Sequence, residues 1–232
     1  MNTTTRIGWL LIAGALGVLL PYTALGFLFE YPAILRQPTG HILQAFQQGG
    51  PRLLLTWWAF ALLGTPLLAA AVLLGQQLEQ RHGAVRLATT LGVAGLLVQM
   101  IGLLRWTFVV PLLARQYTTG DEAARQAAIH SFELIHQWAG VLLGEHLGQL
   151  LSIGWTLLLT RALWQLRIGP RWLHVLATVA SVVYAAAQTE LLATVLPGTP
   201  VLAWAGLAGS SLWLLWLLAL GTWLLRRRPA LQ

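Results

Sequence analysis

The stretch GVLLGEHLGQ, residues 140–149, places two ionisable side chains next to each other inside an apolar run. Glu145 and His146 can take up protons or bind cations, because a carboxylate accepts hydrogen bonds and an imidazole changes charge near neutral pH. Arg105 and Glu190 lie in two other apolar runs, and an arginine supplies a fixed positive charge. These four residues are the leading candidates for a functional site.

The elements that must position these side chains are membrane helices. The chain is 57% hydrophobic and 9% charged, and its mean hydropathy of +0.69 is typical of a polytopic membrane protein. We expect an all-α fold, a single domain over residues 1–232, because the apolar runs do not alternate as strands would and each can cross a core of about 30 Å as a helix. The six expected transmembrane helices span residues 7–29, 53–75, 87–111, 138–163, 172–196 and 201–225.

Arginine predicts the orientation of the bundle. All fourteen basic residues are arginines, and most lie at the chain ends or in alternate loops, which the positive-inside rule assigns to the cytoplasm with both termini. Those on the predicted inner side are Arg6, Arg81, Arg86, Arg161, Arg167, Arg171, Arg226, Arg227 and Arg228. The net charge of +7 then favours anionic lipids at the cytoplasmic face as a partner, and gives no reason to expect nucleic acid.

Tryptophans give a second indication of where the predicted helices meet the membrane interfaces. We expect Trp9, Trp164, Trp172 and Trp223 near the inner interface, and Trp57, Trp58, Trp106, Trp138 and Trp204 near the outer one.

Two outer segments have structure of their own. Residues 30–52 contain a short amphipathic stretch, which predicts a helix lying along the outer interface with Ile42, Leu43 and Phe46 on its apolar face. Residues 112–137 predict a helical hairpin beyond the lipid, in which Thr119 and Glu122 have the spacing of a capping box.

The helix spans place the candidate residues at one depth. At about 1.5 Å per residue, Arg105, Glu145 and Glu190 lie at a similar level in the outer third of the bilayer. A charge facing lipid costs about 2.5–3.5 kcal/mol, so we expect these groups to face inward and pair with Arg105. Glycines at every fourth position would let a neighbouring helix approach closely. The expected pocket comprises Arg105, Glu145, His146, Glu190, Gln149, Gln99 and Tyr184, and the glycines are Gly140, Gly144 and Gly148.

Three kinds of function remain open for this pocket. It can bind a proton, a small ligand or a quinone-like molecule for sensing or transport, or its polar residues can only hold helices together in an accessory subunit. The third possibility is an enzyme or a metal protein. Zinc would then be held by His146, Glu145 and Glu190. A haem could bind instead, but ligation by two histidines is disfavoured because only His146 lies in the predicted core. No cofactor is required, and a non-enzymatic role is favoured. The chain has no cysteine or lysine, which excludes thiolate and Schiff-base chemistry.

Several segments resemble a known group of proteins. FEYPAILRQPTG, GLLRWTFVVPLLA and HQWAGVLLGEHLGQL, with the terminal WLLWLL run, resemble an uncharacterised family of bacterial multi-helix membrane proteins described only as a domain of unknown function. The resemblance covers almost the whole chain. It implies a multi-pass protein of the bacterial cytoplasmic (inner) membrane, and it transfers no catalytic residue.

Overall fold

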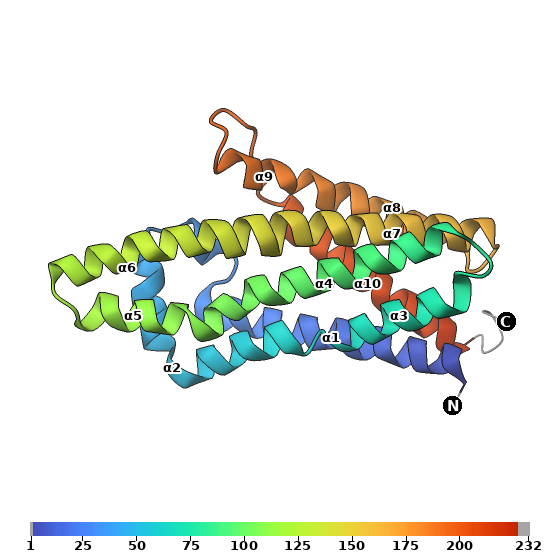
Figure 1. Cartoon of the computed structure of the whole chain (residues 1–232), viewed down its shortest axis with the longest axis horizontal. Helices are drawn as coiled ribbons and strands as arrows, with labels where there is room; N and C mark the ends of the chain where they lie inside the picture. The colour runs from blue at the N-terminus through green and yellow to red at the C-terminus, as the bar shows by residue number, and fades with distance from the viewer. Residues whose placement is uncertain (1, 227–232) are drawn as a thin grey trace. The chain divides into compact units, whose positions relative to one another are not determined.

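The computed structural model describes residues 2–226, and this part of the chain is helical without a strand (Figure 1). The all-α prediction is therefore confirmed. Arg227 and Arg228, two of the arginines on the predicted inner side, lie outside the described residues. The elements are α1 Thr3–Phe29, the 3-10 turn η1 Ala33–Arg36, α2 Thr39–Leu62, α3 Pro66–Leu78, α4 Ala84–Phe108, α5 Val110–Thr119, α6 Glu122–Ile135, the π-helix η2 His136–Leu147, α7 Gly148–Gln165, α8 Arg171–Ala186, α9 Gln188–Ala193 and α10 Ala205–Arg226.

Among the described residues, five helical stretches are long and apolar enough to cross a membrane. They are Thr3–Phe29, Thr39–Leu78, Ala84–Thr119, Arg171–Ala193 and Ala205–Arg226. The one expected span missing from this set covers residues 138–163 and corresponds to η2 and α7. It is less apolar because α7 carries Gln149, Arg161 and Gln165. Five such helices indicate a multi-pass membrane protein.

Three of the expected spans are interrupted. The helix expected over 53–75 ends at Leu62, and a new helix begins at Pro66, because proline lacks the N–H that an interior turn needs. Pro111 acts similarly: α4 ends at Phe108, and Pro111 lies in the first turn of α5. The span expected over 172–196 is divided into α8 and α9.

The chain forms two compact units, and α1, α4 and η2 contribute residues to both. Unit 1 comprises residues 1–16, 64–97 and 146–232; unit 2 comprises residues 17–63 and 98–145.

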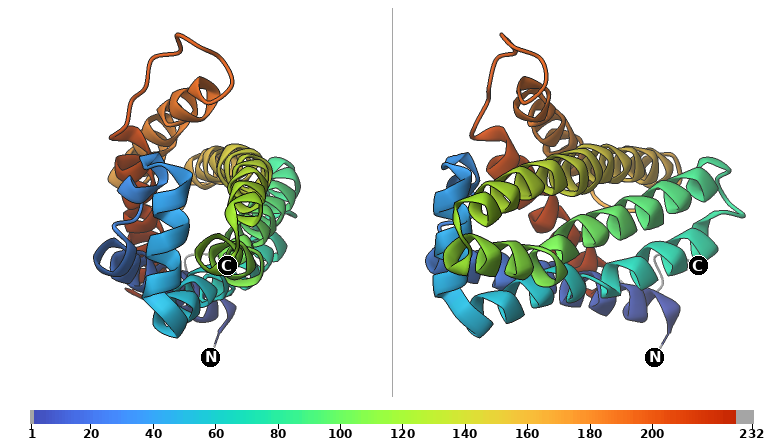
Figure 2. Two further views of the ribbon diagram at one scale, coloured as in Figure 1. Left: turned by 90° about the vertical axis from the view of Figure 1, so that its left-hand side faces the viewer. Right: turned by 60° about the vertical axis from the view of Figure 1, so that its left-hand side comes forward.

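Unit 1 packs its helices through glycines. A methyl group at Gly14 of α1 would lie 2.6 Å from Cγ of Leu67 on α3, and one at Gly209 of α10 would lie 2.5 Å from Cα of Tyr184 on α8. These side-chain-free positions let the helices approach closely. Helix α8 lies between α7 and α10, against both (Figure 2).

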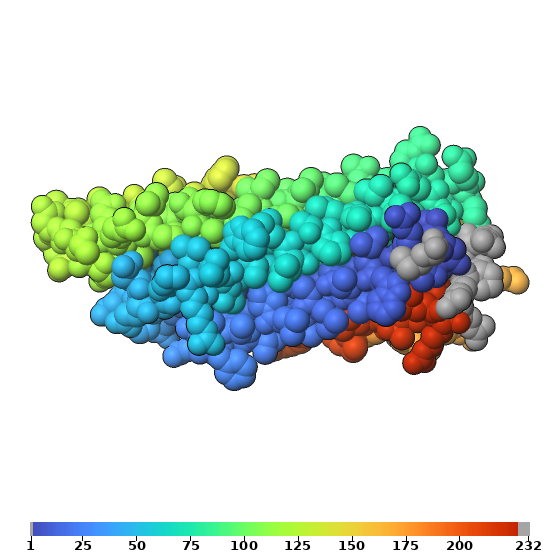
Figure 3. Space-filling model, turned by 90° about the horizontal axis from the view of Figure 1, so that it is seen from below, coloured from blue at the N-terminus to red at the C-terminus, as the bar shows by residue number. Residues whose placement is uncertain are grey.

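Unit 2 packs α2 against α5 and α6, and the space-filling view shows α2 side chains beside those of α5 (Figure 3). Helix α2 bends at Gly50, whose φ of 58° lies in the left-handed region that glycine tolerates. Residues 39–49 are helical, as expected. Their apolar side chains Ile42, Leu43 and Phe46 are buried in the core of unit 2. A position of this segment along the outer interface stays a prediction.

Helices α5 and α6 form a hairpin around Gly120 and Asp121. The expected capping box is wrong. The Asp121 side chain accepts a hydrogen bond from the Ala124 backbone N–H at 2.9 Å and caps α6, whereas the Thr119 hydroxyl donates to the Arg115 carbonyl. A short aspartate is as good an N-cap as threonine, so the helix begins two residues later. The position of this hairpin outside the bilayer stays a prediction.

The tryptophans divide into two groups. Trp9, Trp58, Trp138, Trp164, Trp172 and Trp204 are exposed, as residues facing a membrane interface would be. Trp57 and Trp106 are instead completely buried, and their level relative to the outer interface stays a prediction. Their indoles stack on each other within unit 2 and form the centre of its core.

Candidate binding site around a π-helix

The stretch that contains Glu145 and His146 is a π-helix, η2, rather than the expected α-helix. Hydrogen bonds from residue i to i+5 widen a π-helix to roughly 4.4 residues per turn, and such segments are rare and frequently lie at functional sites. His136 and Glu145 are nine residues apart, about two turns of π-helix but about two and a half turns of α-helix. The π geometry therefore brings both residues to one face, where an α-helix would place them on opposite faces.

Arg105 on α4 is the buried charge at this face of unit 2. Its side chain is 6% exposed, and its guanidinium donates to the Gly102 carbonyl at 2.5 Å and contacts Nδ1 of His136 at 3.4 Å. Glu145 interacts electrostatically with the guanidinium, and His136 is a further neighbour. That Arg105 and Glu145 form an ion pair stays a prediction.

Glycines of η2 make room for this arginine. A methyl group at Gly140 would lie 2.5 Å from Nη2 of Arg105, and one at Gly102 of α4 would lie 2.7 Å from Cα of Gly144. The glycine stripe therefore allows a close approach, as expected, and the helix that approaches is α4. In unit 1, α4 also lies close to the start of α7: a methyl group at Gly95 would lie 3.1 Å from the carbonyl oxygen of Gly148.

His136 was not expected at this site, because it belongs to the hairpin that the sequence predicts beyond the lipid. Its ring stacks on Phe132, with centroids 5.4 Å apart, and meets Trp106 edge-on. Because a guanidinium only donates hydrogen bonds, Nδ1 of His136 faces Arg105 as an acceptor, and the ring adds no second positive charge. Only the π-helical geometry would have revealed it, and no sequence pattern predicted that geometry.

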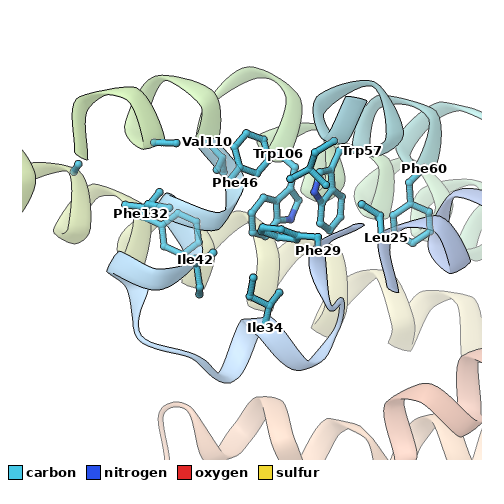
Figure 4. Close-up of a cluster of buried hydrophobic side chains, with 14 residues drawn as sticks. Leu25, Phe29, Ile34, Ile42, Phe46, Trp57, Phe60, Trp106, Val110 and Phe132 are labelled. Atoms are coloured by element: carbon cyan, nitrogen blue, oxygen red, sulfur yellow. The ribbon is translucent and has the colours of Figure 1, made fainter. Parts of the chain in front are cut away.

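An aromatic core lies beside the arginine. The indoles of Trp57 and Trp106 stack face to face with centroids 4.5 Å apart, and Phe29 packs edge-on against both (Figure 4). The Arg105 Cζ atom lies 5.2 Å from the centre of the Trp106 ring, a cation–π arrangement. Unit 2 thus holds a buried cation in apolar and aromatic surroundings.

Unit 1 holds a second polar cluster. Nδ1 of His146 lies 2.7 Å from Oε1 of Gln188, and Nε2 of Gln188 donates to Oε1 of Gln149 at 2.7 Å. With the Gln188 amide oriented in this way, its oxygen accepts from Nδ1–H, which leaves Nε2 of His146 as the basic nitrogen. Two of the expected site residues, His146 and Gln149, are therefore joined through Gln188.

The other expected residues are placed as follows. Gln99 is half-buried on α4 in unit 2, Glu190 is half-buried on α9 in unit 1, and Tyr184 is buried beside Ile153 and Ala205. That all seven residues form one pocket stays a prediction. Over residues 2–226, no group of three or more histidine, aspartate or glutamate side chains gathers to hold a metal ion, so the expected set of His146, Glu145 and Glu190 gains no support.

The fold and these two clusters define a helical membrane protein with polar residues buried among apolar helices. Residues 6–221 match the family described as Domain of unknown function (DUF4386), and the chain belongs to this family. The resemblance noted in the sequence to an uncharacterised family is thereby confirmed. No curated protein and no solved structure matches the chain.

Proposed function

We propose that the chain is a multi-pass membrane protein whose π-helix residues bind a proton or a small ligand, in the service of sensing or transport. The observation that carries the proposal is the π-helix itself. It supplies His136 and Glu145 to the Arg105 cluster of unit 2 and His146 to the glutamine cluster of unit 1.

Each cluster has a distinct chemical role in this proposal. In unit 2, Arg105 is the fixed cation that orients an acceptor group, and Glu145 balances its charge or takes up a proton. In unit 1, His146 binds the proton at Nε2, because Gln188 holds its Nδ1–H. Gln149 fixes the orientation of Gln188, and Glu190 and Tyr184 complete the polar residues assigned to this unit.

Solid-state nitrogen NMR of histidine-labelled protein in lipid tests the proton site. We expect one imidazole in the Nδ1–H tautomer that becomes imidazolium as the pH falls, and this signal should be missing from His146→Gln. Gln188→Leu removes the acceptor of Nδ1–H, so both neutral tautomers of His146 should then be populated. His130→Gln is the matched control, since this exposed ring lies 3.6 Å from Glu133 in unit 2. A His146 ring that is Nε2–H, or stays neutral to pH 5, would contradict the proposal.

Proteoliposomes distinguish transport from sensing. If the chain transports protons, the wild type should dissipate an imposed pH gradient and His146→Gln should not, with His130→Gln again as the control. Titration of His146 without any flux favours sensing. If His146 neither titrates nor supports flux, the buried polar residues only hold the helices together, and the chain is an accessory subunit.

The proposal includes a location and an orientation. The chain would cross a bacterial cytoplasmic membrane six times, with η2 and α7 as the sixth span and both termini inside. Support comes from two groups of arginines between helices. Arg81 and Arg86 lie around the start of α4, and Arg167 and Arg171 lie around the start of α8, where anionic lipid headgroups would bind them. Accessibility of single cysteines, described in the Discussion, tests this orientation.

A further inference from the structure

Four buried side-chain groups among the described residues of unit 2 have no hydrogen-bond partner: the Thr107 hydroxyl and three N–H groups that lie in one cluster. Within the described part of the chain, Nε1 of Trp57, Nε1 of Trp106 and Nε of Arg105 have no hydrogen-bond partner. They belong to three side chains in a row of spatial contacts. The Arg105 guanidinium lies over the Trp106 ring, and that ring stacks on the indole of Trp57. Buried N–H groups are nearly always satisfied in native proteins, so three together need a physical reason.

The polar side chains beside this cluster do not satisfy the three N–H groups. Tyr31 packs edge-on against Trp57, and His136 contacts Nη2 of Arg105, but neither accepts a hydrogen bond from the indoles or from Nε of Arg105. Phe29 packs edge-on against both indoles, Phe46 stacks on Trp106, and Phe132 contacts it edge-on (Figure 4). The core of unit 2 is completed by aliphatic residues such as Leu25 and Ile34. A molecule that satisfies these donors must therefore bring its own acceptor oxygens and must have an apolar body.

The charges near the donors decide between an anion and a neutral acceptor. Arg105 carries one positive charge, Glu145 acts on it with the opposite charge, and Nδ1 of His136 faces the guanidinium as a neutral acceptor. The local net charge is then close to zero, so an added anion would be an unbalanced buried charge. A neutral carbonyl oxygen accepts hydrogen bonds without that penalty.

We propose that the cluster of Trp57, Trp106 and Arg105 binds a planar, apolar carbonyl compound of the quinone type, with its ring against the aromatic side chains and a carbonyl oxygen on the indole N–H groups. Binding alone is proposed, without electron transfer. The inference rests on the proposed function, because it names the ligand class of the Arg105 cluster.

The test uses the full-length chain in lipid nanodiscs and a short-chain benzoquinone that carries one isoprenoid unit. Equilibrium binding is measured against empty nanodiscs, which correct for partition into lipid. We expect saturable binding with one site per chain. 1,4-Dimethoxybenzene, which keeps the ring but lacks the carbonyl groups, should not compete for the site.

Variants locate the binding site. Trp57→Phe and Trp106→Phe keep an aromatic ring and remove one N–H each, so each should raise the Kd by about 5- to 10-fold. The matched control is Trp213→Phe in unit 1, whose indole donates to the Thr156 hydroxyl at 2.9 Å and should leave the Kd unchanged.

Two outcomes would overturn the inference. The first is binding no greater than in empty nanodiscs; a lowered melting temperature of Trp57→Phe would then indicate that a buried water satisfies the donors. The second is an unchanged Kd in the double variant of Trp57 and Trp106. Each outcome leaves the His146 titration unaffected, because that experiment reads a residue of unit 1, so failure of this inference and failure of the proposed function are distinguishable.

Discussion

At the residue scale, the central feature is a guanidinium held in an apolar and aromatic environment. Burying a charge is costly unless it is balanced, and Arg105 is balanced by Glu145 and by the Gly102 carbonyl rather than by a surface ion pair. Its third neighbour, His136, offers Nδ1 as an acceptor and adds no second positive charge. The buried charge of Arg105 is therefore stable only while the Glu145 carboxylate balances it.

Removing this cation tests the pairing. Arg105→Leu should lower the free energy of unfolding by about 3–5 kcal/mol, because it leaves the Glu145 carboxylate without its buried partner. Adding Glu145→Gln to that variant should recover part of the loss, so that the double-mutant cycle shows a positive coupling energy. Unfolding in detergent measures these stabilities, with Arg115→Leu as the control because Arg115 is exposed on α5. Equal stability of Arg105→Leu and wild type would mean that no pairing exists.

Part of this chemistry was predictable from residue types. Arg105 and Glu145 stand out because ionisable residues are rare in apolar runs, and their spacing from the ends of the predicted spans suggested a common depth. His136, Trp57 and Trp106 were not predictable as neighbours of the arginine. Their positions depend on a helix type and on tertiary stacking, which hydrophobic periodicity does not encode.

At the element scale, the crossing of α4 and η2 determines what the site can contain. Gly102 and Gly144 bring the two backbones together, and Gly140 leaves the volume that the guanidinium occupies. The sequence analysis predicted the glycine stripe correctly because its four-residue spacing is visible in the sequence. It predicted neither the π-helix nor the breaks at residues 64 and 187, since local hydrogen-bond register depends on packing as well as on residue type.

Alanine substitutions test this crossing. Gly102→Ala and Gly140→Ala should each lower the free energy of unfolding by about 1–3 kcal/mol, because the new methyl would overlap Ala139 or Gly144 in one case and Arg105 in the other. Gly26→Ala is the matched control. Its methyl would meet only the Tyr31 carbonyl, at 3.7 Å, so it should raise stability by about 0.5–1 kcal/mol through helix propensity. Denaturant titration of the three variants measures the difference, and tolerance of Gly140→Ala would exclude the close contact with Arg105.

At the scale of the whole molecule, the open quantity is the number of times the chain crosses the membrane. Five helical stretches meet the length and composition that a span requires, and the sixth expected span is the one that carries Glu145, His146 and Gln149. These polar side chains make the helix less apolar, and they are also the candidate functional residues. Composition therefore identifies the class of protein with ease, while it leaves the membrane position of its most polar helix to experiment.

Single cysteines determine that position cleanly, because the natural chain has none. Thr119→Cys lies in the α5–α6 turn, Gly83→Cys lies between α3 and α4, and Leu166→Cys follows α7. With six spans and both termini in the cytoplasm, an impermeant maleimide added to intact cells should label only residue 119, while residues 83 and 166 should react after permeabilisation. Labelling of both 119 and 166 from outside would instead place η2 and α7 on one side of the membrane, giving five spans and termini on opposite sides. In that arrangement His146 would not lie within the bilayer, and a role in moving protons across it would be excluded.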